Sequence, residues 1–254
     1  MAWTVRLANA LLAGCLVISA APAARAADTV TVGAEDSWYP FSGLVKGKLQ
    51  GMTVDIVREA FKTVGVQVRF EPMPYARCVA LARSGVQLAC FDTFRTPDTE
   101  SEFLWHSPSL FRVDYLVYAR AGAKRRHLGV RDLEGRRVAV TRGYEYGAEF
   151  DRNTKIQREL SSSDESNFRM LLAGRVEYTI TAKIIADKLF KAHPELARKF
   201  KVVGLVSRND VYMAFSRRHP DGPQEMARFE KGLRIIRENG RLQAIERQWL
   251  HRAD

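Results

Sequence analysis

The hydrophobic positions along the chain change their period repeatedly, which predicts an alternation of strands and helices. Residues 29–34 (TVTVGA) alternate polar and apolar side chains with the period of two that is typical of a strand. Residues 52–64 instead place valine and phenylalanine at helical spacing, and the glycine at 65 ends that pattern. Alternation of these two periods is typical of an α/β fold.

The same alternation continues to the end of the chain. We predict strands at 29–34, 66–70, 86–91, 111–120, 136–141, 176–181, 200–206 and 211–216. We predict helices at 52–64, 75–84, 167–173, 182–190, 225–237 and 241–250. The strand at 211–216 is expected to return to the part of the fold that holds the first strands.

Residues 71–111 contain five of the candidate binding residues. A short helix ends at Ser84-Gly85, a buried strand follows, and a polar loop comes after Phe91. In a βαβ unit the start of the helix and the end of the next strand lie at the same edge of the sheet, where open α/β sheets bind ligands. We therefore expect one mouth to be lined by Arg77, Asp92, Thr93, Arg95 and Thr96.

Two cysteines lie in the same stretch, Cys78 in the first helical turn and Cys90 near the end of the strand. In an oxidising compartment they are expected to form a disulfide that closes a loop of about 13 residues and contributes roughly 3 kcal/mol. The alternative is a pair of separate buried thiols, because free cysteine is often a core residue.

Residues 1–26 are predicted to be a secretory signal peptide. A short basic start precedes an apolar run at 7–21 and the small-x-small cleavage site Ala24-Arg25-Ala26. Leu12-Ala13-Gly14-Cys15 resembles a lipoprotein box that would tether the protein through Cys15, but the apolar run continues beyond it. We therefore favour a free periplasmic protein over a tethered one.

The net charge is +11, and removal of residues 1–26 takes away two arginines and no acids, which leaves +9. A basic surface attracts anions, so an anionic ligand or an anionic membrane surface would fit, and so would a solvated surface without a binding role. Nucleic acid is not expected, because no zinc-finger spacing and no aromatic ribonucleoprotein motif are present. The five histidines are scattered without metal-ligand spacing, so neither a metal nor another cofactor is expected.

Seven segments, in this order and spacing, carry a resemblance to a known family. They are the WYPF loop, LQGMTVDIVREAF, LARSGVQLA, TPDTESEFLWHSPSLF, DLEGRRVAVTRG, LLAGRVEYTI and IIRENGRLQAIERQWL. Together they resemble the type II periplasmic solute-binding proteins, in particular the polar-amino-acid-binding family of ABC importers (family 3). The resemblance covers essentially the whole chain after the signal peptide.

This resemblance implies an α/β clamshell of two lobes with a ligand cleft between them. Lobe 1 would comprise residues 28–117 and 211–254, and lobe 2 residues 118–210. Family members place an aromatic side chain of the first loop beneath the ligand, and Trp38 falls there, with Tyr39 and Phe41 beside it. Trp38 could instead cap the core.

The same loop supplies an acid at Glu35. The turn after the strand at 136–141 supplies Gly143 and Tyr144, and a glycine there lets backbone N–H groups face a ligand, although it also suits a plain tight turn.

Two departures from the family pattern concern the ligand anchors. The arginine that holds an α-carboxylate is replaced by Thr99, and the aspartate that holds an α-ammonium is absent from the stretch 180–183. Losing both argues against an ordinary α-amino acid in the usual pose, because a buried carboxylate without its arginine is costly. Arg77 or Arg95 could clamp an anion from another direction. Asp92 could bind a cationic group or only neutralise these arginines.

We therefore expect a monomeric, non-enzymatic periplasmic protein that captures a small polar, anionic ligand for an ABC permease. The alternative is a periplasmic sensor or adaptor of the same fold that acts on another inner-membrane protein, in signalling or redox chemistry. A dehydratase-like enzyme is the least favoured reading, because no nucleophile and base pair is evident.

Overall fold

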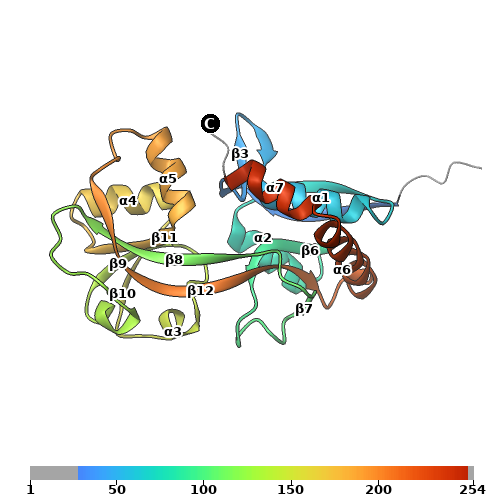
Figure 1. Cartoon of the computed structure of the whole chain (residues 1–254). Coiled ribbons are helices and arrows are strands. Elements are labelled where there is room, and N and C mark those ends of the chain that lie inside the picture. Colours follow the sequence, from blue (N-terminus) through green and yellow to red (C-terminus); the bar gives the residue numbers. More distant parts are fainter. Residues whose placement is uncertain (1–27, 251–254) are drawn as a thin grey trace, which may run out of the picture.

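The structure is a computed structural model that describes residues 28–250 as a mixed α/β protein (Figure 1). Its strands are β1 (Asp28–Glu35), β2 (Ser37–Trp38), β3 (Ser42–Val45), β4 (Lys48–Gln50), β5 (Val66–Met73), β6 (Ala89–Phe94), β7 (Phe103–Trp105), β8 (Phe111–Arg120), β9 (Arg137–Thr141), β10 (Gln157–Ser161), β11 (Tyr178–Ala182) and β12 (Phe200–Ser216). Its helices are α1 (Met52–Lys62), α2 (Tyr75–Ser84), α3 (Ala148–Asp151), α4 (Asp164–Leu172), α5 (Lys183–Ala192), α6 (Gly222–Glu238) and α7 (Arg241–Leu250), with a short 3₁₀ turn at Val130–Leu133.

The sheet joins two groups of elements. Its strand order is β10-β9-β11-β8-β12-β6-β1-β5, and β7 also pairs with β12. Figure 1 shows β1, β5 and β6 with α1, α2, α6 and α7 in one group, called lobe 1 below, and β9–β11 with α3–α5 in the other, lobe 2. The predicted two-lobe α/β clamshell is therefore the architecture of the chain.

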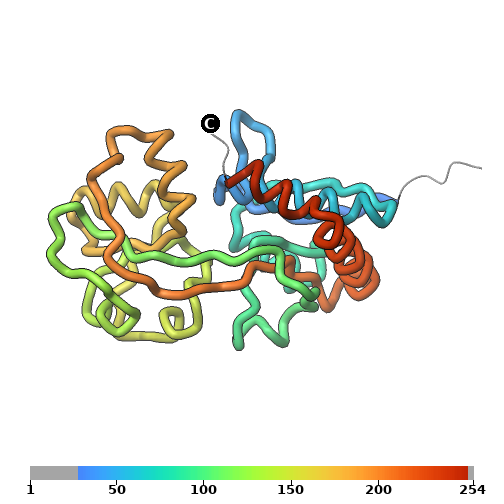
Figure 2. Tube along the Cα trace, in the orientation of Figure 1, coloured from blue at the N-terminus to red at the C-terminus, as the bar shows by residue number. Residues whose placement is uncertain are grey.

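The long antiparallel strands β8 and β12 run side by side from one lobe to the other (Figure 2). The lobe boundaries predicted after residues 117 and 210 fall within these two strands, and they stay a prediction. Since both connections belong to one ribbon, the ribbon is the element about which the lobes can move relative to each other.

The prediction of two separate strands at 200–206 and 211–216 is wrong, because β12 runs through residues 207–210 without a break. Those residues (SRND) are polar, which suggested a loop. In the structure they pair with β8 between the lobes, where Arg208 lies opposite Asp114 and Asp210 opposite Arg112. Since both faces of a two-stranded ribbon contact solvent, polar residues suit it, and pairing rather than hydrophobic alternation specifies the strand.

A similar shift affects the strand predicted at 86–91, which lies at Ala89–Phe94 instead. All six of its residues are buried, so the buried strand includes the polar side chains of Asp92 and Thr93. Asp92 and Thr93 therefore belong to the strand and not to the loop that follows it.

His106 belongs to the core of lobe 1. It is fully buried, its Nδ1–H donates to the carbonyl of Pro108 over 2.8 Å, and its Nε2 accepts the backbone N–H of Met213 at 3.0 Å. Burial lowers the pKa of its imidazole to about 4, so the ring is neutral at ordinary pH. Its role is to connect the end of β7 with β12.

The predicted disulfide between Cys78 and Cys90 is present, with an S–S distance of 2.05 Å. It fastens α2 to β6, and both cysteines are fully buried. Gly33 of β1 lies beneath this bond, since a Cβ there would approach Cys78 Sγ to 2.7 Å. The absence of a side chain at Gly33 therefore allows α2 to pack closely on the sheet.

Replacing both cysteines with alanine is expected to lower the free energy of unfolding by roughly 3 kcal/mol, because the loop in the unfolded chain is no longer closed. Urea titrations of the wild type and the double variant measure this loss. A reductant should destabilise the wild type by a similar amount and leave the double variant unchanged. Equal stability of all these forms would contradict the assignment.

Candidate ligand-binding site

A small cavity lies where the two lobes meet. Its volume is about 10 Å³, roughly the space that one water molecule needs. Lobe 1 contributes side chains from the end of β1, from β2, from the start of α2 and from β6. Lobe 2 contributes the turn after β9, and one residue comes from β8. The lining residues are Glu35, Trp38, Tyr75, Asp92, Phe94, Tyr115, Tyr144 and Glu145.

Glu35 is the last residue of β1 and is 1% exposed. The hydroxyl of Tyr144 donates a hydrogen bond to its Oε1, which joins lobe 1 to the second lobe. Burial raises the pKa of the Glu35 carboxyl well above its ordinary value, and the nearby charge of Asp92 raises it further. The group is therefore held between the lobes at a cost in desolvation.

Asp92 occupies a strained position in β6. Its φ of 64° lies in the left-handed region, which a residue with a side chain seldom adopts. Thr53, at the start of α1, donates from its hydroxyl to Asp92 Oδ1 over 2.6 Å. The other oxygen, Oδ2, is buried without a hydrogen-bond partner among residues 28–250. Burial raises the pKa of Asp92 to about 7.

Lobe 2 brings two further acids that the sequence analysis did not single out. Glu145 Oε2 accepts a hydrogen bond of 2.6 Å from the hydroxyl of Tyr75, a second contact between the lobes. Asp164 begins α4 and is 8% exposed. Burial raises the pKa of both carboxyl groups to about 7. The acidic start of the helix at residue 164 was the only signal in the sequence.

Aromatic rings form much of the cavity wall. The indole of Trp38 is 2% exposed, and its Nε1 has no hydrogen-bond partner within the described part of the chain. Tyr75 and Tyr144, one from each lobe, meet edge to face with their ring centroids 5.4 Å apart. Phe94 and Tyr115 meet in the same way at 5.6 Å. The wall thus combines ring faces and edges with carboxyl oxygens.

Four of the predicted site residues meet at this cavity: Glu35, Trp38, Asp92 and Tyr144. Phe41 instead stacks on Phe111, with ring centroids 4.8 Å apart, and Tyr39 packs edge-on against Trp249. Gly143 lies on the surface of the turn next to Ala76, where a Cβ would come within 2.7 Å of the alanine side chain. Small residues at this point let the lobes approach.

The remaining predicted residues do not converge on the cavity. Arg77 is exposed on α2, and Arg95 is exposed and forms two hydrogen bonds of 2.6 Å with Glu100. Thr93 donates to the backbone carbonyl of Tyr212, while Thr96 belongs to a turn. The proposed arginine clamp is therefore not formed: Asp92 points into the cleft, whereas Arg77 and Arg95 project outside it.

Two larger hollows adjoin each other between the lobes, where both are lined by Asp36 and Ser37. One, of about 520 Å³, shares Tyr75 and Tyr144 with it and is also lined by Thr141, Arg142 and Ser161. The other, of about 720 Å³, lies between the β3–β4 hairpin and α5. Together they form a cleft that leads from the surface to the buried acids.

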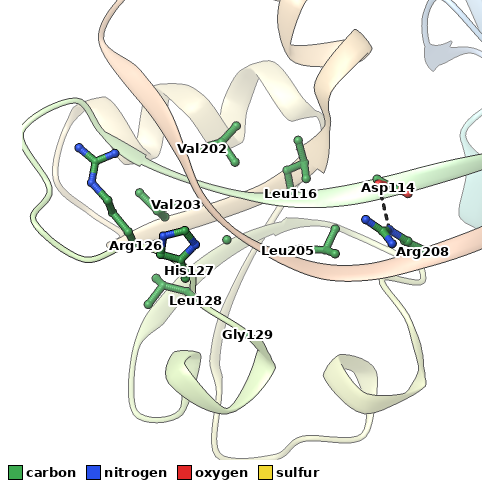
Figure 3. A pocket seen from close by; sticks show the side chains of 11 residues that line it. Asp114, Leu116, Arg126, His127, Leu128, Gly129, Val202, Val203, Leu205 and Arg208 are labelled. Atoms are coloured by element: carbon green, nitrogen blue, oxygen red, sulfur yellow. Dashed lines mark hydrogen bonds and ion pairs between the residues drawn. The ribbon is translucent and has the colours of Figure 1, made fainter.

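A further hollow of about 620 Å³ lies on lobe 2, away from the cleft (Figure 3). Its floor includes Leu116, Val203 and Leu205, and its charged members include Arg208, which is paired with Asp114. None of its lining residues is a buried polar side chain. The cleft between the lobes is therefore the better candidate site.

Comparison with known proteins points to one family. The model of the bacterial extracellular solute-binding proteins, family 3, matches residues 30–252. A relative from Haemophilus influenzae, described as a probable amino-acid ABC transporter-binding protein, is 24% identical over 95% of each chain.

Solved structures share the fold. A histidine kinase sensor domain with similarity to periplasmic binding proteins is 22% identical, with a TM-score of 0.77 over 87% of this chain and 96% of that one. An ancestral arginine-binding protein bound to arginine is 21% identical, with a TM-score of 0.75 over 87% and 97%. A putative L-cystine ABC transporter protein from Listeria monocytogenes is 21% identical, with a TM-score of 0.75 over 88% and 96%.

The buried carboxyl groups predict stability that falls as the pH rises. Asp92, Glu145 and Asp164 have folded pKa values of about 7, whereas the same groups titrate near 4 in an unfolded chain. Between these values the folded protein binds more protons than the unfolded one, so the stabilisation is complete below about pH 4 and is lost as the pH passes 7. Each group contributes at most about 1.4 kcal/mol per pH unit.

Urea titrations between about pH 5 and 8 should show this decrease, and Asp92→Asn should make it shallower. Asparagine keeps an oxygen for the Thr53 hydroxyl and cannot ionise. Glu149→Gln, an exposed acid on α3, is the control and should retain the wild-type slope. Stability that increases with pH over this range would contradict the assignment.

Proposed function

The chain belongs to the bacterial extracellular solute-binding proteins of family 3, and from this premise we propose that it captures one small polar solute in the cleft between its lobes. Members of this family are binding proteins and not enzymes, and they deliver small ligands to ABC permeases. We propose the same delivery here, from the periplasm. The predicted signal peptide and Cys15 lie outside the described residues, and within residues 28–250 no helix is long and apolar enough to cross a bilayer.

The observation that supports this proposal best is the pair of unsatisfied polar atoms in the buried cavity. Asp92 Oδ2 and Trp38 Nε1 are both buried without a partner among the described residues. Leaving such a group unpaired costs about 1–3 kcal/mol, and more when it is charged. A solute that pairs with both atoms would recover that cost, so the site favours a polar solute.

The charge of the solute is where the proposal departs from the sequence-based hypothesis. That hypothesis favoured an anion because Arg77 and Arg95 were expected at the mouth. Neither lines the cavity, and none of the eight residues that do is basic. We therefore no longer expect a carboxylate at the bottom of the cleft.

The residues at the two lost anchor positions do not replace the missing anchors. Thr99 is 8% exposed and donates from its hydroxyl to the carbonyl of Phe94 at 2.9 Å, within a turn. In the stretch 180–183, which lacks the aspartate, Ala182 is the last residue of β11 and has no polar side chain. An α-amino acid held in the pose that the family resemblance implies would find neither partner. The solute must be recognised by other groups.

Capture would proceed by closure of the lobes about the β8–β12 ribbon. Polar contacts that cross the cleft include those of Tyr144 with Glu35 and of Tyr75 with Glu145, and the ion pair of Arg152 with Asp98. A solute that contacts both lobes stabilises the closed form relative to the open form, which is what a permease would recognise.

A periplasmic sensor or adaptor of the same fold is the second candidate. The feature that favours it is that the contacts across the cleft join side chains of the protein itself. Such contacts stabilise the closed form without help from a solute. A protein that is closed at rest would suit a partner that recognises shape rather than cargo.

Removing a contact across the cleft should shift the chain toward the open form. Tyr75→Phe deletes the hydroxyl that donates to Glu145, and Arg152→Ala deletes the exposed ion pair with Asp98. Solution X-ray scattering should show a larger radius of gyration for the double variant than for the wild type. Arg69→Ala, which removes an exposed ion pair with Glu71 inside lobe 1, is the control and should leave the radius unchanged.

If the double variant keeps the wild-type radius, these contacts do not hold the lobes together. If a solute added to the double variant restores the compact form, this result supports solute capture over a role as sensor or adaptor.

The function itself is tested by identifying the solute and its transporter. Protein purified gently from periplasm is analysed by mass spectrometry for a stoichiometric small molecule. That molecule, with the protein, should raise ATP hydrolysis by the partner permease in membranes. A partner that responds to the protein alone would instead favour the sensor or adaptor.

A further inference from the structure

We propose that the small cavity between the lobes is a head-group site for a primary ammonium, so that the solute is an organic amine bound with its amine buried. This inference rests on the proposed function, and it names the class of solute that the cleft selects.

The charged side chains that line the cavity are all acidic. Glu35, Asp92 and Glu145 line a single cavity, and none of them forms an ion pair with a residue of the described chain. The groups that face them are hydroxyls: Tyr144 on Glu35, Thr53 on Asp92 and Tyr75 on Glu145. A cation that entered would be the missing opposite charge, whereas an anion would add to the repulsion.

Two polar atoms of the cavity lack a hydrogen-bond partner among the described residues. Asp92 Oδ2 is an acceptor without a donor, and it belongs to a side chain only 4% exposed. An ammonium has three N–H donors and no acceptor, so it can serve Oδ2 and one oxygen of a neighbouring acid at once. Trp38 Nε1 is a donor without an acceptor, independent of the acids. Its acceptor must come from the solute next to the amine or from a water that enters with it.

The aromatic lining and the small volume of the cavity both suit an ammonium group. The rings of Trp38, Tyr75, Tyr115 and Tyr144 surround the acids, and aromatic faces attract cations within about 6 Å of the ring centroid. The cavity has a volume of about 10 Å³, enough for one water-sized group. A primary ammonium has that size, and a trimethylated one does not.

A larger hollow connects the small cavity with the surface and can hold the rest of the solute. Tyr75 and Tyr144 belong both to the small cavity and to the hollow of about 520 Å³. That hollow is lined by the hydroxyl-bearing Ser37, Thr141, Ser161 and Ser162 and by Arg142. Arg142 is exposed and forms no ion pair within residues 28–250. The remainder of the amine would lie there, and a tail with hydrogen-bond acceptors fits it.

Matched probes test the head group apart from the tail. 4-Aminobutanoate and 4-hydroxybutanoate share the tail and differ only in whether the head is an ammonium or a hydroxyl, and 1-aminobutane has the ammonium without the carboxylate. Calorimetry and thermal denaturation with each compound measure binding. We expect both amines to bind and to raise Tm, and 4-hydroxybutanoate to bind at least tenfold more weakly than 4-aminobutanoate.

Variants locate the binding. Asp92→Asn should weaken binding of 4-aminobutanoate at least tenfold, because one negative charge next to the ammonium is removed while the Thr53 hydrogen bond can persist. Glu149→Gln removes an exposed acid of the second lobe and should bind like the wild type. Near-ultraviolet circular dichroism confirms that each variant is folded.

Proton release gives an independent measurement. At pH 6 the Asp92 carboxyl is largely protonated, since its pKa is raised to about 7 by burial. Binding of an ammonium requires the ionised form, so calorimetry in two buffers of different ionisation enthalpy should report protons released on binding. The release should be smaller in Asp92→Asn.

The outcomes separate this inference from the proposed function. If neither amine binds, or if 4-hydroxybutanoate binds as tightly as 4-aminobutanoate, the ammonium site is wrong. The receptor function then stands if a solute without an amine is released from the native protein, and falls if no solute binds at all. Amine binding that is insensitive to Asp92→Asn also overturns the site.

Discussion

Burial of carboxyl groups between the two lobes is the constraint on which the rest of the structure depends. Glu35, Asp92, Glu145 and Asp164 come from four different segments, and none of them has a basic partner among residues 28–250. Desolvation disfavours their charged forms, so the surrounding hydroxyls and rings must compensate. Natural proteins tolerate such a cost mainly at functional sites. The cleft is therefore a better candidate for the binding site than the larger hollow on lobe 2.

The fold places these acids by simple means. The disulfide between Cys78 and Cys90 fastens α2 to β6, and these two elements carry Tyr75 and Asp92. The β8–β12 ribbon then sets the second lobe opposite, so that Tyr144 reaches Glu35. Rigid elements within each lobe and one ribbon between them give a site that is ordered locally and adjustable as a whole, as capture by closure requires.

The sequence was most informative where a pattern is local. Helical spacing located α1 and α7, the glycine at 85 ended α2, and the pairing of Cys78 with Cys90 followed from their places in neighbouring elements. It failed at β12, because the polar residues 207–210 read as a loop until β8 is beside them. It also placed Arg77 and Arg95 in the site, although a side chain near the correct edge can still point to solvent.

The sequence by itself determined the class of fold, the order of most elements and the resemblance to a family of binding proteins, because periodicity, turn residues and short motifs depend on neighbours along the chain. It favoured the disulfide, and the structure showed the bond. Tertiary structure alone decided which charges face the solute. Only when the lobes come together does Glu145 line one cavity with Glu35 and Asp92, and only then does the charge of Asp164 act on Glu35. Arg95 is held away from the cavity by Glu100. The electrostatic character of a cleft depends on the burial of charged groups and on distances between residues far apart in the sequence, which a local sequence pattern does not predict.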